Sequence, residues 1–416
     1  MKSILHTVFA LNYCLLSACA AAPQVPDRNS DNNFDLTIAK FSDLPSVGTT
    51  TNGQKILLGG FSGLNFLGMT EDGKRMRFVT HTDRGPNCEP TKLNGKKVRP
   101  FPLSNFQPQI VHFEYDPNAK LVRITKQIPL QKENGTALTG LPNLKDEGET
   151  PVDLTGNPVS FDKAGGDLEA IASLPDGSYW IGDEYQPSLF RFNSAGKLQN
   201  RIVPQKSKVS GLKEIPAVYG KRKDNRGFEA LAYDGKKLYA FLQSPLKTGA
   251  KKTKNLRILE FDPTSLKTTA QYLYILENGP SDKIGDAISI GRGEFLVLEA
   301  GQKTKKKSAT KRIYKISLAG ATNVNATPAL ETLSSQALTA QNITPAGKKL
   351  FLDLSGPEFP KLDKLEGLAL VDATQVALVN DNDFGLDGEC DLKSGMISES
   401  KNPENSLFML VKTKKP

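Results

Sequence analysis

Acidic residues recur in this sequence at two fixed places relative to short apolar runs. In the first place the acid lies at the start of an apolar run, as at Glu169, Glu229, Asp286 and Glu366. In the second place the acid lies at the end of the next apolar run, as at Asp83, Asp183, Glu184, Glu299, Asp381 and Asp383. Carboxylates that lie close together raise one another's pKa unless a cation or an arginine lies among them. If the fold gathers these acids, their repetition predicts a cation site or acid–base chemistry.

The kind of ligand indicates the kind of cation. Oxygen ligands suit Ca²⁺ or Mg²⁺ better than Zn²⁺, and beyond the first 33 residues the only histidines are His81 and His112. We therefore expect a divalent cation, Ca²⁺ in the first instance. The expected metal ligands are Glu229, Asp286, Glu299 and Glu366.

Other residues are assigned to catalysis and to substrate binding. The expected catalytic carboxylates are Glu169, Asp183, Glu184, Asp381 and Asp383. Asp83, Arg84 and Arg226 are expected to bind substrate. For Arg84 and Arg226 the reason is that each guanidinium offers a bidentate fork to an anionic group. The alternative is structural: the acids accept hydrogen bonds from backbone N–H groups of neighbouring strands, and the arginines pair with neighbouring acids.

The acids recur because a longer module recurs. Its clearest copy is residues 166–192, in which a Pro-Asp-Gly turn separates the apolar run around Glu169 from a second run that ends at Asp183 and Glu184. Asp-Gly between two short apolar runs is typical of a β-hairpin. Further copies lie at residues 61–84, 228–243, 285–299 and 365–383.

Third and fourth strands follow most copies, and four-stranded units that repeat radially describe an all-β β-propeller. We expect five or six blades, the sixth lying in residues 322–353. The last copy lacks a fourth strand, which residues 34–41 would supply, so that strands from both chain ends close the ring. Two stacked sandwich domains are the alternative. Long helices are not expected, since no stretch keeps an apolar period of 3.6 beyond two turns.

Two cysteines occupy equivalent places in the first and last modules. Cys88 and Cys390 each lie a few residues beyond the same strand end. Ring closure would make these modules neighbours, and a cysteine pair in an oxidising compartment can form a disulfide. A Cys88–Cys390 disulfide is therefore predicted, with two unpaired thiols as the alternative.

The first residues predict export. Lys2, an apolar stretch at residues 4–16 and small residues after it are typical of a secretory signal peptide, and the stretch is too short to span a membrane. Residues 16–19 also resemble a bacterial lipobox, which predicts lipidation of Cys19. Cleavage a few residues later, giving a periplasmic or secreted protein, is the alternative.

The remaining chain divides simply. Residues 1–19 are the expected signal peptide, residues 20–33 a flexible tether, and residues 34–416 a single domain. The only membrane contact expected is the N-terminal lipid anchor, which would make the protein a cell-envelope lipoprotein.

The chain is basic, with a net charge of +9, and this charge favours anionic surfaces or phosphorylated substrates. Much of the charge lies in lysine runs at residues 251–254 and 303–307, which read as solvated loops between strands. No nucleic-acid motif is present, so no nucleic-acid partner is expected. The expected partner is a small anionic or ester substrate.

Six stretches of the chain resemble the phytase-like domain family, known as "esterase-like activity of phytase". They are Thr82–Pro86, Asp167–Ala172, Gly182–Tyr185, Asn225–Ala232, Phe295–Glu299 and Asp381–Phe384, and the resemblance covers residues 55–412. It implies an exported β-propeller and a hydrolase of phosphate or carboxyl esters. One departure is Gln186, where the family pattern has glycine before the proline.

Motifs of several other hydrolases are missing from the sequence. It contains no RHGxRxP, no CxxxxxR phosphatase loop and no Gly-x-Ser-x-Gly elbow. Metal-assisted hydrolysis remains, with a cation that polarises the ester and a carboxylate that acts as base. The prediction is an exported hydrolase of phosphate or other esters. A non-catalytic binding or scaffold protein of the cell envelope and a metal-dependent lactonase are the alternatives.

Overall fold

The computed structural model describes most of the chain after the N-terminal segment. The described residues are 34–145, 148–247, 254–277, 283–301, 310–357, 359–362, 364–386, 389–398 and 405–414. The predicted signal peptide, the predicted lipidation at Cys19 and the predicted tether at residues 20–33 lie outside them. Within the described residues, no helix is long and apolar enough to cross a membrane.

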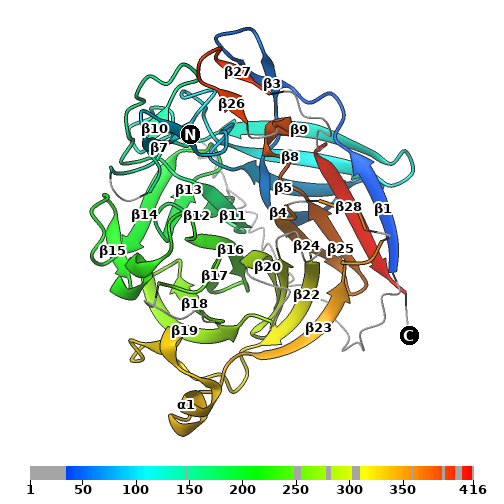
Figure 1. The fold of residues 1–416 in the computed structure, drawn as a ribbon. Helices are drawn as coiled ribbons and strands as arrows, with labels where there is room; N and C mark the ends of the chain where they lie inside the picture. Colours follow the sequence, from blue (N-terminus) through cyan, green and yellow to red (C-terminus); the bar gives the residue numbers. More distant parts are fainter. Residues whose placement is uncertain are drawn as a thin grey trace, which may run out of the picture.

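Five antiparallel sheets form the body of the described chain (Figure 1). The first contains β4 (Phe61–Met69), β5 (Met76–Thr82), β8 (Gln109–Asp116) and β9 (Leu121–Pro129). The second contains β11 (Leu168–Ser173), β12 (Tyr179–Asp183), β13 (Ser188–Phe192), β14 (Leu198–Pro204) and β15 (Leu212–Ile215), the last of which runs parallel to β14. The third contains β16 (Phe228–Tyr233), β17 (Leu238–Leu242), β18 (Asn255–Asp262) and β19 (Lys267–Ile275).

The last two sheets complete the set. The fourth contains β20 (Lys283–Gly291), β21 (Glu294–Gly301), β22 (Thr310–Ser317) and β23 (Gly347–Asp353). The fifth contains β24 (Gly367–Asp372), β25 (Gln375–Val379), β28 (Leu407–Thr413) and β1 (Phe34–Lys40). Strand β1 pairs antiparallel with β28, with Phe34 opposite Thr413, so strands from the two ends of the described chain share one sheet, as predicted.

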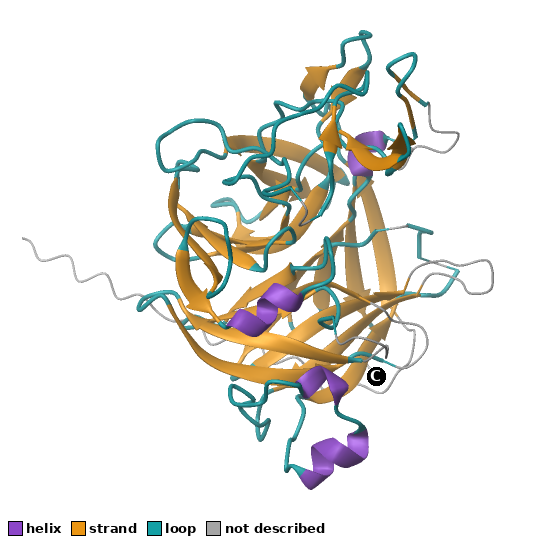
Figure 2. Cartoon of the chain, turned by 60° about the vertical axis from the view of Figure 1, so that its left-hand side comes forward, coloured by secondary structure: helices purple, strands orange, loops and turns teal. Residues whose placement is uncertain are grey.

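Smaller elements decorate these sheets, and Figure 2 shows that the helices are few and short. The small sheets contain β2 (Ser46–Thr49) with β3 (Lys55–Leu57), β6 (Thr91–Leu93) with β7 (Lys96–Pro100) and β10 (Pro151–Val152), and β26 (Cys390–Asp391) with β27 (Met396–Ile397). The helices are η1 (Ala217–Lys221), η2 (Leu330–Thr332), α1 (Ser335–Ala340) and η3 (Asp383–Gly385). Residues 322–353, where a sixth unit was an option, hold η2, α1 and β23, the outer strand of the fourth sheet.

The hairpin predicted in the clearest module is present, and its turn explains the residues found there. Gly177 adopts a φ of 78°, which is accessible to glycine without strain, and its N–H donates to the carbonyl of Leu174. The Asp176 carboxylate accepts hydrogen bonds from the backbone N–H and the hydroxyl of Ser178. Strands β11 and β12 therefore leave this turn in the register that places their carboxylates at the opposite end.

The first strands of the five sheets contact one another in a closed order. Strand β4 contacts β11, β11 contacts β16, β16 contacts β20, β20 contacts β24, and β24 contacts β4. In Figure 1 these strands lie nearest the centre, with the later strands of each sheet farther out. The arrangement brings five equivalent strand ends around one axis.

Aromatic side chains fill the spaces between neighbouring sheets. The rings of Trp180 on β12 and Phe261 on β18 lie 5.6 Å apart, and those of Phe78 on β5 and Phe408 on β28 lie 5.0 Å apart. All four residues are buried. Because burial of apolar area stabilises by about 25 cal/mol per Å², these layers hold adjacent sheets together and fix the inner strands in place.

The predicted disulfide between Cys88 and Cys390 is present, and the prediction is confirmed. The two Cα atoms lie 5.9 Å apart and are separated by 302 residues in sequence. Cys88 follows β5 of the first sheet and Cys390 begins β26, shortly after β25 of the fifth sheet. The bond therefore ties the start of the sheet series to its end.

Candidate functional site

A polar cavity of about 670 Å³ lies where the inner strands end. Eight of the predicted site residues line it: Asp83, Arg84, Glu169, Glu184, Arg226, Glu366, Asp381 and Asp383. Four others do not: Asp183, Glu229, Asp286 and Glu299. The repeat thus brings together residues up to 300 positions apart in sequence, as the recurrence of the acids indicated.

Bulges in the inner strands direct two of the acids. The pairing of β11 with β12 skips Glu169, and the pairing of β16 with β17 skips Glu229. A bulge leaves one residue outside the ladder and re-aims its side chain. Glu169 and Glu229 therefore share a β-bulge as well as a position in the repeat. The bulge turns their carboxylates away from the regular faces of their sheets.

Three carboxylates converge at one side of the cavity, and we call Asp167, Glu169 and Glu184 the acidic triad. One ligand oxygen of each lies within 4.8 Å of the others. Each side chain is buried, and each retains an oxygen with no hydrogen-bond partner among the described residues: Oδ1 of Asp167, Oε2 of Glu169 and Oε1 of Glu184. Buried polar atoms normally have partners, so these three orphaned oxygens are groups that could hold a positive ligand.

The triad carboxylates carry raised pKa values. Burial, together with the charges of Asp167 and Glu229, raises the pKa of Glu169 well above its ordinary range. Burial raises the pKa of Asp167 to about 6, although the Arg84 guanidinium opposes the shift. Without a cation, burial and the repulsion between the carboxylates favour the protonated form of all three groups.

Sequence reasoning missed Asp167 as a site residue. It begins the stretch Asp167–Ala172 but precedes the acid position that the other modules share. Its backbone N–H donates to Asp183, 3.0 Å away, which fixes the start of β11 against the loop that carries Glu184. The repeat gave no sign of Asp167, but its place in the stretch Asp167–Ala172, which resembles the phytase-like family, could have identified it as a site residue.

A glycine allows the neighbouring strand to approach this loop. A side chain at Gly227 would collide with the backbone of Asp183 and Glu184. This close approach accounts for the glycine in the stretch Asn225–Ala232, and it brings Arg226 beside the triad.

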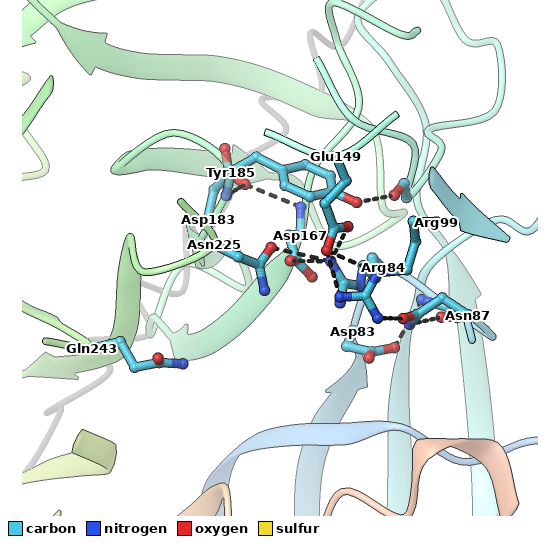
Figure 3. Close-up of polar contacts among 12 residues, drawn as sticks. Asp83, Arg84, Asn87, Arg99, Glu149, Asp167, Asp183, Tyr185, Asn225 and Gln243 are labelled. Atoms are coloured by element: carbon cyan, nitrogen blue, oxygen red, sulfur yellow. Dashed lines mark hydrogen bonds and ion pairs between the residues drawn. The ribbon is translucent and has the colours of Figure 1, made fainter. Parts of the chain in front are cut away.

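Arg84 lies within a dense set of polar contacts, shown in Figure 3. Its Nη1 atom donates to Glu149 at 3.0 Å, to Asp167 at 3.1 Å and to Asn225 at 3.1 Å. Glu149 also accepts from Nε of Arg99 at 2.8 Å. Arg84, predicted to bind substrate, therefore lines the cavity but also positions Asp167. Glu149 and Arg99 were not predicted, because they lie in the loops and small strands between modules.

Arg226, the second predicted anion-binding residue, has a different setting. It donates to Oε1 of Gln243, whose Nε2 atom donates to Glu229 at 2.7 Å. Glu229 is buried and keeps Oε1 without a partner among the described residues. Burial and the charge of Glu366 raise the pKa of Glu229 to about 8.

Two lysines, Lys283 and Lys364, neither of them predicted, also line the cavity. Lys283 pairs with Glu366 at 2.8 Å. Burial alone would raise the pKa of Glu366, but Lys283 and then Lys364 lower it to about 2. Glu366, one of the four expected metal ligands, is therefore held as a carboxylate within an ion pair.

Lys364 joins the two acids at the end of β25. Its Nζ lies 2.6 Å from Asp381 and 2.5 Å from Asp383. Burial and the charge of Asp383 nevertheless raise the pKa of Asp381 to about 7. The side chain of Asp383 is 42% exposed, so this pair lies nearer to solvent than the triad does.

Asp83 interacts electrostatically with Asp167 of the triad and with Lys364 and Asp381. It accepts a hydrogen bond from the N–H of Gly85 at 2.8 Å. Burial and the charge of Asp381 raise its pKa well above its ordinary range, while Lys364 opposes the shift. The cavity lining therefore combines acids of the triad, Glu169 and Glu184, with the lysine–carboxylate pairs of Lys283 and Lys364.

Two of the predicted acids tie the backbone together. Asp183 accepts from the N–H of Asp167 at 3.0 Å and from the hydroxyl of Ser188 at 2.6 Å. Asp286 accepts from the N–H of Leu368 at 2.7 Å, which joins β20 to β24. These two acids therefore accept hydrogen bonds from backbone N–H groups, as the alternative to a catalytic or metal-binding role predicted.

Glu299 belongs to a separate cluster away from the cavity. It accepts hydrogen bonds from the Tyr274 hydroxyl and from Nζ of Lys348. Lys348 also lies 4.0 Å from the centroid of the Tyr314 ring. The Glu299 carboxylate, which was expected to bind metal, therefore accepts hydrogen bonds from a lysine and a tyrosine instead.

The fold and the site together define an all-β protein with a buried, carboxylate-rich cavity at the ends of its inner strands. Residues 56–384 match the Phytase-like family, described as "Esterase-like activity of phytase", and the chain belongs to this family. The resemblance found in the sequence is thereby confirmed.

Individual relatives are distant. An "Uncharacterized secreted protein" of Arthroderma benhamiae is 30% identical over 201 residues, which cover 39% of this chain and 39% of that relative. The chain therefore matches less than half the length of this relative. Solved structures with similar chain traces include a luciferin-regenerating enzyme (12% identity, coverage 91% and 95%, TM-score 0.35). Another is a GH62 α-L-arabinofuranosidase catalytic domain of Coprinopsis cinerea (10% identity, coverage 92% and 98%, TM-score 0.40).

Proposed function

We propose that this protein is an exported hydrolase of phosphate esters or other esters, built on a five-bladed β-propeller. Membership of the phytase-like family supports an ester substrate. The closed order of contacts among the inner strands supports the propeller, with β1 and β28 completing its last blade. The disulfide and the secreted fungal relative support export. Lipidation at Cys19, which would anchor the protein in the envelope, remains part of this proposal.

The acidic triad is the proposed site of a divalent cation, with Ca²⁺ as the first candidate. Its three orphaned, buried carboxylate oxygens are the observation that carries the proposal. We favour Asp167, Glu169 and Glu184 over the four ligands expected from the sequence. Among those four, Asp286, Glu299 and Glu366 already engage amides or lysines, as described above. A cation there would polarise an ester oxygen and lower the pKa of a bound water.

The chain's own residues supply the remaining functions. Arg226 beside the triad binds an anionic oxygen of the substrate. Asp381, whose pKa of about 7 lets it exchange a proton near neutrality, serves as the general base. Lys364 holds Asp381 in place and Asp383 completes this pair. Arg84 and Glu149 keep Asp167 turned toward the other triad carboxylates.

The second candidate is a non-catalytic binding or scaffold protein of the cell envelope. The amide contacts of Asp183 and Asp286 favour it, because they show that part of the acid repeat is structural. It predicts cation binding without turnover. A metal-dependent lactonase is a variant of the first proposal with a different ester.

A substrate panel separates these candidates. Purified protein is assayed with an aryl phosphate, an aryl acetate and an aliphatic lactone, with added Ca²⁺ and with chelator. We expect turnover of one ester class that chelator removes, and at least a hundredfold loss in Glu184→Gln and Asp381→Asn. Glu89→Gln, a change at an exposed carboxylate of the cavity rim, is the matched control. No turnover of any ester by the cation-loaded protein would reject the enzyme proposal in favour of the binding protein.

A further inference from the structure

The cavity is acidic although the protein is basic. Nine carboxylates line it against six lysines and arginines, whereas the whole chain carries a net charge of +9. Asp167 and Glu229 lie directly behind this lining and add two more acids. The positive charge of the protein is therefore elsewhere, and the cavity itself repels anions unless particular cationic groups are free to receive them.

Most cationic groups of the cavity are already neutralised. Arg84 and Arg99 share Glu149, and Arg84 also pairs with Asp167. Lys283 pairs with Glu366. Lys364 holds Asp381 and Asp383. A substrate anion that approached these groups would compete with carboxylates already in contact with them.

Arg226 is the exception inside the cavity. Its contact among the described residues is the side-chain carbonyl of Gln243, with no ion pair to a carboxylate, and its side chain is half-buried. Lys97, which also has no ion pair among the described residues, is exposed at the rim. Arg226 is thus the one guanidinium of the described cavity lining without an ion pair to a carboxylate, although its charge opposes the rise that burial causes in the pKa values of Glu184 and Glu229, and a guanidinium can bind an oxyanion through two N–H groups.

The repeat explains why Arg226 is free. Gln243 follows β17 at the place that Asp83 takes after β5 and Glu184 takes after β12. In all three cases the backbone N–H of the residue donates to the carbonyl of the residue just before the inner strand, which is Gly227, Gly60 or Asp167. A carboxylate at position 243 would pair with Arg226. The amide instead accepts one hydrogen bond from Arg226 and donates another to Glu229, so no carboxylate at position 243 forms an ion pair with the guanidinium.

We propose that the cavity selects substrates that carry a single anionic group, bound by Arg226, and that it rejects polyanions. Gln243 is the residue that keeps Arg226 available. The proposal rests on the proposed ester-hydrolase function for the identity of the ligand as a small ester. Its chemical basis is separate: one free guanidinium can receive one oxyanion, and further anionic groups on the same molecule would face Asp83, Glu184 and their acidic neighbours.

The test measures binding rather than turnover. Phenyl phosphate and inositol hexakisphosphate are titrated into the full-length protein by calorimetry, with Ca²⁺ present and with chelator. We expect phenyl phosphate to bind at least tenfold more tightly than the hexakisphosphate in both conditions. A tighter or equal affinity for the hexakisphosphate, or no binding of phenyl phosphate, overturns the proposal.

Variants assign the selectivity to its residues. Arg226→Gln and Gln243→Glu should each weaken phenyl phosphate binding at least tenfold, the first by removing the guanidinium and the second by pairing it. Arg123→Gln, at an exposed residue of β9, is the charge-matched control and should leave the affinity unchanged. Thermal melts establish that each variant is folded, and Arg226→Lys provides a second test, with a loss intermediate between wild type and Arg226→Gln.

The two failures are distinguishable. Retained selectivity in the binding assay without hydrolysis of any ester rejects the proposed function and leaves the single-anion site standing. The other failure is that the protein hydrolyses an ester but the Gln243→Glu variant binds phenyl phosphate as tightly as wild type does. This result rejects the role of Arg226 and Gln243 and leaves the proposed function standing.

Discussion

Replacing Glu184 by glutamine should have opposite effects on the protein with and without a divalent cation. Without a cation, the triad holds buried carboxylates that prefer to stay protonated. The shift of the Asp167 pKa from 3.8 to about 6 corresponds to about 3 kcal/mol of lost stability at pH 8, since one pKa unit is about 1.4 kcal/mol. Between pH 3.8 and about 6 the Asp167 carboxyl keeps its proton in the native state but loses it in the unfolded state. The native state therefore loses stability as the pH rises through this range. Burial and the charges of Glu229 and Asp167 raise the pKa of Glu184 well above its ordinary range, and glutamine removes this buried acid, so cation-free Glu184→Gln should be more stable than wild type at pH 8.

With the cation, the order should reverse. Extracellular Ca²⁺ sites bind with dissociation constants on the order of 10⁻⁴–10⁻³ M. At about 10 mM Ca²⁺ such a site stabilises the native state by about 1.4–2.7 kcal/mol. For a chain of 416 residues, an unfolding entropy of about 2.1 cal/mol/K per residue converts this gain into a rise in Tm of about 2–3 °C. Glu184→Gln loses one ligand oxygen and should show little of this rise.

Scanning calorimetry with chelator and with Ca²⁺, at pH 8, measures both effects. Glu89→Gln removes a carboxylate from the rim without touching the triad, and it should keep the wild-type response to Ca²⁺. The reasoning is refuted if wild type and Glu184→Gln gain equally from Ca²⁺. It is also refuted if neither Ca²⁺ nor Mg²⁺ shifts the wild-type melting temperature.

Three further predictions concern acid stability, the disulfide and the proposed base. Burial lowers the pKa of His81 from 6.5 to about 4, so the native state binds fewer protons, and stability should fall by about 3 kcal/mol between pH 6.5 and 4 in urea titrations. His81→Gln should flatten that dependence. Reducing Cys88–Cys390, whose cysteines are 302 positions apart, should cost about 6 kcal/mol by chain entropy, seen as a lower denaturant midpoint. Lys364→Gln removes the cation that lowers the pKa of Asp381, so the acid limb of the pH–rate profile should move up by about one pH unit; an unmoved limb would exclude Asp381 as the base.

The repeated hairpins were predictable because their signals are local. A turn such as Asp176-Gly177 requires a left-handed residue, and the flanking apolar runs specify strands that must bury both faces. Once five such hairpins are read, the missing strand at residues 34–41 and the disulfide follow from closing the series. Both features, β1 beside β28 and the Cys88–Cys390 bond, are confirmed. The fate of residues 322–353 was not predictable, because a short insertion and a further sheet have similar local patterns.

The division of labour among the acids could not be read from the sequence. Asp183 and Glu184 are neighbours in sequence, yet Asp183 accepts hydrogen bonds from backbone N–H groups whereas Glu184 belongs to the acidic triad. Successive side chains of a strand point to opposite faces, so recurrence identifies the pair but does not say which member reaches the cavity. Lys283 and Lys364 escaped notice because they occupy no recurring position, and their role depends on contacts across sheets.

The chemistry of the cavity arises where the modules differ. At the end of the second strand, one copy binds amides through Asp183, another offers the amide Gln243 beside a free Arg226, and the last holds Asp381 on a lysine. A ring of identical copies would place like charges around the axis, where each would raise the pKa of the next and none could bind an anion. Divergence among the modules is therefore what would place the proposed cation-binding triad and the proposed anion-binding Arg226 in one cavity. Exchanging Gln243 for the acid found in its sister modules is accordingly the single change expected to pair the guanidinium of Arg226 with a carboxylate and to weaken the affinity of the cavity for a substrate anion at least tenfold.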